Sequence, residues 1–216
     1  MSYLLGSDDP GMGADQFDFQ LIQTKTIAPA TTIPFNLATK TSTEGIPGLA
    51  IYGTYENFKL IVHGVISPSG HAALQFRMGV SLDPPAIAGG GADYGWSMSY
   101  LEATGTRTTA APSGEADVTE SEVFVSPVTK HDQDNTDSPG ALTVEVDVYG
   151  TLKGDNWTYC KFQTVYVNQP AGNLVYCHGG GVMRKVAAVT GFRVQFNGLP
   201  SFYGTANLYG IKGTPA

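Results

Sequence analysis

Histidine and cysteine are the first residues to consider for chemistry, because they bind metals and act as bases or nucleophiles. The sequence has four histidines, at His63, His71, His131 and His178. None forms an H-x-H or H-x-x-x-H pair, so a zinc site would need ligands from distant loops. Cys177 and His178 are adjacent, but neighbours on a strand point to opposite faces, which is poor geometry for a nucleophile and its base. We therefore predict no metal and no catalytic pair here.

The two cysteines, Cys160 and Cys177, flank a turn at residues 168–172. If this turn closes a hairpin, Cys160 lies opposite Gly180 or Gly181, and a disulfide would need another register. We expect two buried free thiols.

The acidic residues offer two further possibilities. Residues 131–137, HDQDNTD, carry oxygen ligands of the kind that Ca²⁺ prefers. They fail the EF-hand pattern, because Asp137 replaces its glycine and Thr143 its bidentate glutamate, so a solvated loop is expected. A pair of carboxylates for glycoside hydrolysis could come together in space. The candidates are Asp93, Glu102, Glu115, Asp117, Glu120 and Glu122, and nothing in the sequence singles out two of them.

Two glycine runs, residues 89–91 and 179–181, lack the Lys-Ser/Thr of a phosphate-binding loop, so we interpret them as flexible turns or bulges. We predict no catalytic residue, no cofactor and no enzymatic activity.

Aromatic residues are the remaining candidates, with eleven tyrosines, ten phenylalanines and two tryptophans. Tyrosine and tryptophan combine a large apolar area with a polar group, so exposed rings could stack on sugars or fill a subunit interface. Packing in the core or at an interface is the default interpretation, and a carbohydrate site is the alternative. The residues selected as candidate ligand or interface positions are Tyr94, Trp96, Tyr100 and Trp157.

Composition limits the partners and the compartment. The 216 residues are 42% hydrophobic and 14% charged, with a net charge of −7 and with lysine and arginine scattered singly. This argues against nucleic-acid binding, which needs a basic surface. No apolar run is long enough to cross a bilayer, and the first residues lack the pattern of a secretory signal, so we expect synthesis in the cytoplasm and no membrane insertion. The low charge suits either an assembly or a β protein with a neutral polar surface.

Apolar and polar residues alternate with period two over roughly ten segments, as expected for β-strands with one buried face. We predict a hairpin with Phe58 on one strand and Met78 on the other, and a second hairpin over residues 192–211. Pro29 and Pro34 restrict the first two strands, residues 17–23 and 31–37, to edges or bulges. Further strands are expected at residues 94–100, 118–125, 142–148, 157–167 and 174–185, with loops at 83–91, 104–114 and 126–140.

This pattern predicts an all-β fold, an antiparallel β-sandwich or jelly roll with an extended N-terminal arm. We assign residues 1–40 to the arm and edge strands, which would anchor the protein to a larger particle. Residues 41–216 form the jelly-roll domain. Because a terminal edge strand would fray, we expect the last strand to lie in the middle or at the seam of a sheet.

The closing segment, FRVQF followed by YGTANLYGIKG, resembles the C-terminal signature of small jelly-roll virion proteins of tailed bacteriophages. The segments YENFKLIVHGV, HAALQFRMGVSLD, DYGWSMSY, GALTVEVDVYG and WTYCKFQTVYV are similar to the preceding strands of that family. The resemblance covers residues 52–212 and leaves residues 1–40 outside.

The resemblance implies a non-enzymatic structural protein of the virion, a tail fibre, spike or capsid decoration. Such a subunit would form a homotrimer and would contact other virion proteins through the N-terminal arm. The alternative is a receptor- or carbohydrate-binding module for attachment to the host surface, with the loops at 83–91, 104–114 and 126–140 meeting the glycan. A depolymerase of surface polysaccharide is a weaker alternative, because no carboxylate pair stands out.

Overall fold

The computed structural model describes residues 19–30, 32–37, 55–66, 73–79, 93–103, 113–120, 122–127, 140–151, 156–168, 173–196 and 202–211. These residues form strands and their flanking segments, without a helix. The strands are β1 (Phe19–Ala30), β2 (Thr32–Asn36), β3 (Asn57–Ile66), β4 (Leu74–Gly79), β5 (Tyr94–Ala103), β6 (Ser113–Glu120), β7 (Val123–Phe124), β8 (Gly140–Tyr149), β9 (Thr158–Asn168), β10 (Asn173–Met183), β11 (Gly191–Phe196) and β12 (Phe202–Ile211). The predicted all-β class is confirmed.

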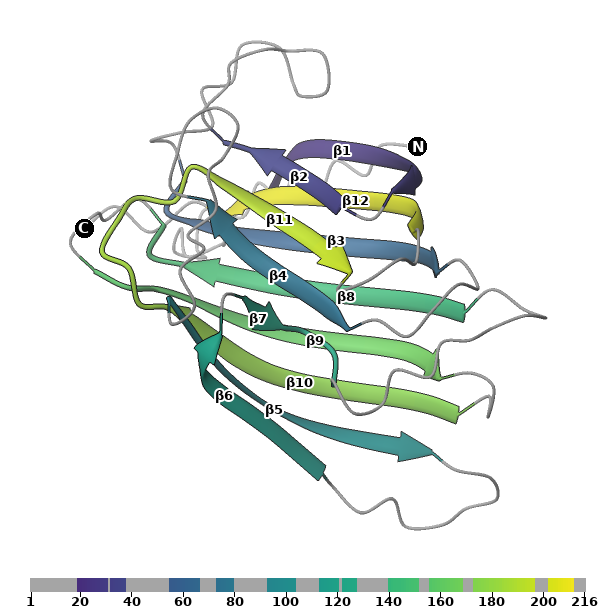
Figure 1. Cartoon of the computed structure of the whole chain (residues 1–216). Helices are drawn as coiled ribbons and strands as arrows, with labels where there is room; N and C mark the ends of the chain where they lie inside the picture. Colours follow the sequence, from purple (N-terminus) through teal and green to yellow (C-terminus); the bar gives the residue numbers. More distant parts are fainter. Residues whose placement is uncertain are drawn as a thin grey trace, which may run out of the picture.

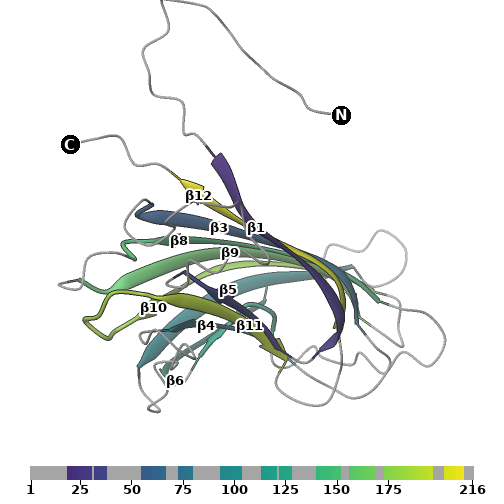
Figure 2. The same ribbon diagram turned by 90° about the horizontal axis from the view of Figure 1, so that it is seen from above.

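The strands form two antiparallel sheets that pack face to face (Figure 1). The large sheet has the order β1-β12-β3-β8-β9-β10-β5-β6, and the small sheet has the order β2-β11-β4-β7. Figure 2 shows the large sheet curving around the small one. The antiparallel β-sandwich predicted from the sequence is therefore confirmed.

The chain repeatedly crosses from one sheet to the other. Four neighbouring strands of the large sheet, in the order β1-β12-β3-β8, match the strands β2-β11-β4-β7 of the small sheet one by one. Each matched pair, β1 with β2, β12 with β11, β3 with β4 and β8 with β7, is consecutive in the chain. This order is consistent with a jelly roll, in which a folded ribbon of strand pairs supplies both layers. Strands β5, β6, β9 and β10 extend the large sheet beyond that row.

Both hairpins expected from the sequence are wrong. Strand β3 pairs with β12 and β8, whereas β4 pairs with β11 and β7 in the other sheet. Strands β11 and β12 likewise belong to different sheets. The strand expected at residues 118–125 is divided in the same way, into β6 and β7. Alternation shows which side chains are buried, but both sheets bury theirs in one core, so it cannot show which strands are partners.

Several other expectations are confirmed. Strands β1 and β2 lie at sheet edges, and the register of β1 shifts around Pro29, between Ile27 and Ala30. Strand β12 lies inside the large sheet, between β1 and β3. Strands β9 and β10 form the hairpin expected around residues 168–172, and Cys160 lies opposite Gly181. Both cysteines are free and buried.

Most of the expected arm and loops lie outside the described residues. These are residues 1–18 and 38–40 of the arm region, residues 83–91, most of 104–114 and most of 126–140, including the acidic cluster at 131–137. The described parts of the last two loops include Ser113 and Gly114, which begin β6, and Gly140, which begins β8.

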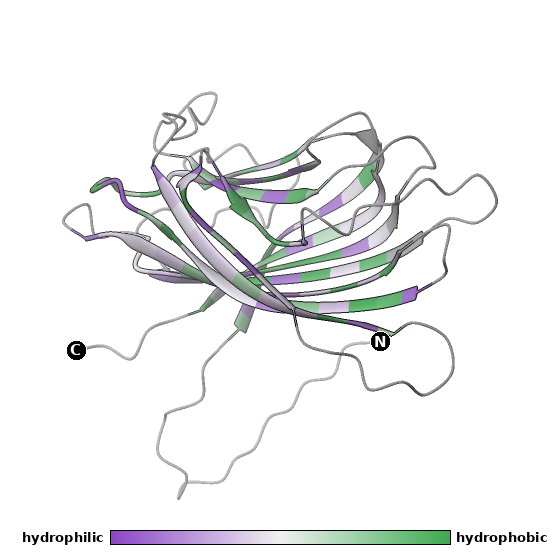
Figure 3. Cartoon of the chain, turned by 60° about the horizontal axis from the view of Figure 1, so that its bottom comes forward, coloured by the Kyte–Doolittle hydropathy of each residue, from purple (hydrophilic) through white to green (hydrophobic). Residues whose placement is uncertain are grey.

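The core lies between the concave face of the large sheet and the facing side of the small sheet. Figure 3 shows hydrophobic and hydrophilic residues alternating along the strands, as expected when successive side chains point to opposite faces. Phe192 of β11 links the layers, because its ring lies 5.4 Å from the ring of Phe58 on β3 and 5.7 Å from that of Phe76 on β4. The hydroxyl of Tyr94 also joins them: it donates to the Met78 carbonyl oxygen at 2.9 Å and accepts from the Met78 amide at 3.0 Å.

Residues 179–181 form the middle of β10 and pair regularly with β9 and β5, so their assignment to a turn or bulge is wrong. Gly179 and Gly181 face the core, where larger side chains approach them. A Cβ atom at Gly179 would overlap the Ser97 carbonyl oxygen and lie 2.5 Å from Phe162 Cζ, and one at Gly181 would lie 2.6 Å from Val123 Cγ2. Here glycine makes room for core side chains.

We expect Gly179→Ala to lower the free energy of unfolding by about 1–3 kcal/mol, because the added methyl group overpacks the core beneath Phe162. Gly180→Ala is the matched control. Its Cβ atom would lie on the outer face, where the nearest atom is the Cys160 carbonyl oxygen at 3.3 Å. Urea denaturation of both variants measures the difference, and equal destabilisation would contradict this account.

Candidate functional site

The structure separates the four aromatic residues selected from the sequence. Tyr94, Trp96 and Tyr100 alternate along β5 and face the core, with exposed fractions of 0%, 7% and 8%. Their rings are therefore not presented on the surface of this fold. Trp157 lies just before β9 with 44% of its surface exposed. The three β5 rings share the inner face of the strand and pack in the core, which is the default interpretation given for them above.

The acidic candidates lie on or next to β5, β6 and β7: Asp93 precedes β5, Glu120 lies opposite Tyr94, and Glu122 precedes β7. Glu115 lies opposite Met98, and Glu102 lies four residues further along β5, an offset of about 13 Å along the strand. Asp117 accepts hydrogen bonds from the amide and hydroxyl of Thr119, which lower its pKa and favour the carboxylate. Glu122 is buried and bound by Gln75 and Arg77. These contacts hold Asp117 and Glu122 in structural roles.

The two thiols lie inside the core, and the two cysteines are not cross-strand partners. Cys177 lies opposite Thr164, and both side chains donate to the Val125 carbonyl oxygen, at 3.4 and 2.5 Å. Burial raises the pKa of the Cys160 thiol to about 12 and that of the Cys177 thiol to about 12. Both thiols are therefore protonated near neutral pH, whereas the thiolate is the reactive form.

We expect neither thiol to react with 5,5′-dithiobis(2-nitrobenzoic acid) in the folded protein at about pH 8, and both to react in urea, where the pKa returns to about 8.5. The thiol pKa is higher in the folded protein than in the unfolded chain. Between about pH 8.5 and 12 the unfolded chain therefore loses its thiol protons while the folded protein keeps them, so the free energy of unfolding falls as the pH rises through that range. Rapid labelling of either cysteine without unfolding would contradict this placement.

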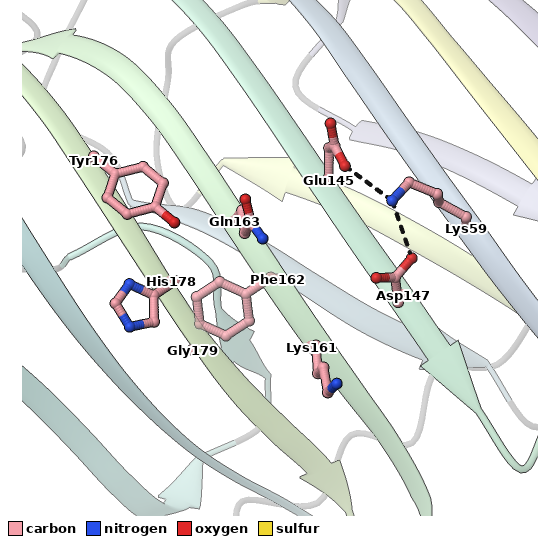
Figure 4. Close-up of a pocket in the computed structure, with 9 residues that line it drawn as sticks. All are labelled: Lys59, Glu145, Asp147, Lys161, Phe162, Gln163, Tyr176, His178 and Gly179. Atoms are coloured by element: carbon pink, nitrogen blue, oxygen red, sulfur yellow. Dashed lines mark ion pairs between the residues drawn. The ribbon is translucent and has the colours of Figure 1, made fainter.

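The outer face of the large sheet carries a hollow of about 340 Å³ (Figure 4). Its polar wall is formed by Lys59 of β3 with Glu145 and Asp147 of β8. Lys161 and Gln163 of β9 occupy the centre. On the opposite side, β10 contributes the rings of Tyr176 and His178 (Figure 4). We call this feature the outer hollow.

Strand register brings these residues together in two cross-strand rows. Lys59, Asp147 and Lys161 are successive partners on β3, β8 and β9. In the next row, Glu145, Gln163 and His178 are successive partners on β8, β9 and β10. Directly opposed outward residues on an antiparallel pair have neighbouring Cβ atoms, so each row forms one continuous line of side chains.

Ion pairing organises the polar wall of the outer hollow. Lys59 Nζ lies 2.9 Å from Glu145 Oε2 and 3.4 Å from Asp147 Oδ1. Burial lowers the pKa of Lys59, but hydrogen bonds and charge interactions with the two carboxylates outweigh it and raise the pKa overall. Lys161 Nζ lies 5.9 Å from the centre of the Tyr149 ring, within range of a cation–π contact. Two lysines and two carboxylates leave the hollow with no net formal charge.

The aromatic wall is formed by neighbouring side chains of β10. The rings of Tyr176 and His178 lie 5.7 Å apart, inclined at 34°. The outer hollow therefore combines ring surface, an amide, two ammonium groups and two carboxylates on four adjacent strands. Such a set can bind a polar ligand through several hydrogen bonds, and its carboxylates are held as acceptors by Lys59.

Within the described part of the chain, no group of three or more His, Cys, Asp or Glu side chains is placed to hold a metal ion. The same residues include no helix with the length and apolar character needed to span a bilayer.

No protein-family model matches the chain, and neither a curated protein nor a solved structure matches it. The class is therefore defined by the structure itself: an antiparallel β-sandwich whose larger sheet has a polar hollow on its outer face.

Sequence reasoning missed the outer hollow. Its residues alternate with core residues on β8 and β9, so their exposure could be expected from period-two patterning. Their proximity could not, because it depends on the order β3-β8-β9-β10.

Proposed function

We propose that the protein is a non-enzymatic structural subunit of a bacteriophage virion, which assembles as a homo-oligomer through the outer face of its large sheet. The resemblance of residues 52–212 to small virion jelly-roll proteins supports the class, and the confirmed β-sandwich agrees with it. The observation that carries the assembly step is a row of uncharged residues across seven strands.

This uncharged row follows the strand register without interruption across β1, β12, β3, β8, β9, β10 and β5. Its members are Thr26, Thr205, His63, Thr143, Val165, Tyr176 and Leu101. None is lysine, arginine, aspartate or glutamate. Six of the seven are exposed, and Thr143 is half-buried.

The apolar end of the uncharged row has the composition of an interface. Leu101, Val165 and Tyr176 are 41%, 38% and 36% exposed, and they are direct cross-strand neighbours. Leu174, next to Tyr176 on the same face of β10, is 50% exposed. Interface centres are depleted in charge and enriched in aromatic residues, and contiguous apolar patches on soluble proteins mark interaction sites. A neighbouring copy of the chain is the proposed occupant, and in a closed trimer it would meet this row with a different patch of its surface.

The expected stoichiometry, a trimer, comes from the family resemblance. Closed symmetry lets copies use the same residues at every contact, which suits a fibre, spike or decoration on a virion. Attachment to other virion proteins through residues 1–40 belongs to the same proposal.

Light scattering of the purified protein tests the assembly step. We expect a mass of three times 22.8 kDa for the natural sequence. Leu101→Asp should shift the mass towards a single chain, because burying an unpaired carboxylate at the interface is costly.

Val118→Asp is the matched control. Val118 is 63% exposed and lies on β6, outside the uncharged row, so this variant should retain the mass of the natural sequence. A natural protein that remains a monomer, or a Leu101→Asp variant with unchanged mass, would contradict assembly through this face.

A further inference from the structure

We infer that the outer hollow is a binding site for a neutral sugar, of the size of a monosaccharide or one unit of a short oligosaccharide. The inference goes beyond the proposed structural role and does not rest on it. It depends on the size of the hollow, the types of its side chains and their charge balance.

The size of the outer hollow suits a small ligand. Its volume of about 340 Å³ lies near the lower end of the ~300–1,000 Å³ typical of small-molecule sites. The lining residues come from the interiors of four adjacent strands, β3, β8, β9 and β10. Side chains on such strands are held by a fixed register, which lowers the entropic cost of binding.

The side chains are arranged as a sugar requires. A pyranose ring has an apolar C–H face and a rim of hydroxyl groups that donate and accept hydrogen bonds. Tyr176 and His178 offer ring surface on one side of the hollow (Figure 4). Gln163 offers a donor and an acceptor at the centre, and Lys161 offers donors beside it.

The carboxylates supply acceptors that are already oriented. Lys59 is paired with Oε2 of Glu145 and Oδ1 of Asp147, and each carboxylate has a second oxygen as a further acceptor. An ionised carboxylate can accept several hydrogen bonds, so these second oxygens are available to hydroxyl groups. Hydrogen bonds to charged acceptors are about twice as strong as neutral ones.

Charge balance selects among the possible ligands. Lys59 and Lys161 are matched by Glu145 and Asp147, so the hollow has no excess charge with which to hold a phosphate, a sulfate or a polyamine. An anionic ligand would also meet the two carboxylates. A neutral polyhydroxylated ligand needs no excess charge and is not repelled by the carboxylates, and its hydroxyl groups can hydrogen-bond to the polar side chains of the site.

Titration calorimetry and protein-observed NMR test the site with three neutral probes, maltotriose, mannotriose and chitotriose, and with N-acetylneuraminic acid as an anionic comparator. We expect at least one neutral probe to bind with a Kd of about 1 mM or tighter. Binding should shift the side-chain amide signals of Gln163. The anionic sugar should bind more weakly.

Gln163→Ala and His178→Ala should each weaken binding of that probe by about tenfold. Both residues are exposed, so the variants should fold, and circular dichroism checks this. Tyr203→Ala is the control, since Tyr203 is 44% exposed on β12, outside the hollow. It should bind as the natural sequence does.

The inference is overturned if none of the neutral probes binds, if the anionic sugar binds more tightly, or if the hollow variants bind normally. Tyr176 lines the hollow and also belongs to the uncharged row, so the sugar titration is made on the Leu101→Asp variant as well as on the natural sequence. Light scattering reports assembly and binding by the single chain reports the hollow, so failure of the assembly proposal and failure of the sugar site are distinguishable.

Discussion

The packing of the two inner faces against each other is the constraint on which the rest of the structure depends. Seven strands of the large sheet and the four strands of the small sheet bury side chains in one layer. Strand β7 has two residues, yet Val123 packs against Gly181, and Phe124 lies 5.3 Å from the Trp96 ring. The extension of the large sheet through β10 and β5 is covered because glycines there allow this close approach.

This constraint uses one face of seven strands of the large sheet, β1, β12, β3, β8, β9, β10 and β5, and leaves their other face free; the edge strand β6 has no buried residue. The aromatic residues of β5 are occupied in the core, so binding has to be sought on the outer face. That face is divided by register into rows of different chemistry. The rows through Asp147 and Glu145 carry charged pairs and the outer hollow, whereas the next row, through Thr143 and Val165, has no charge.

The sequence predicted the faces of the strands well and their partners poorly. The alternation in β8 and the shared face of Tyr94, Trp96 and Tyr100 on β5 follow directly from period two, because alternation is a local consequence of strand geometry. That the β5 face is the inner one was not predicted, since its rings were selected as ligand or interface candidates. The register of Cys160 opposite Gly181 followed from a short hairpin. By contrast, the connections after β3 and β11 are short and were expected to close hairpins, but they lead to the other sheet.

Short connections and alternating strands are common to a hairpin and to a crossing between layers. The chain adopts the hairpin or the crossing according to which of them buries more apolar surface over the whole domain. This depends on contacts between residues far apart in the sequence. The outer hollow was missed for the same reason. Lys59 lies far from Glu145 in the chain, and β3 and β8 become neighbours only when the sandwich closes.

Tyr176 belongs both to the outer hollow and to the uncharged row, so the two surfaces meet along β10. Lys59 decides whether they are compatible. Without its ammonium group, Glu145 and Asp147 would present two like charges on one face of β8, one row from the residues through which copies are proposed to meet. Such charges would repel a second copy of this acidic chain, whose net charge is −7, at distances below a Debye length of about 8–10 Å. By pairing with both carboxylates, Lys59 compensates their charge, so one ion-pair cluster would serve the proposed assembly and the proposed ligand site on the same face.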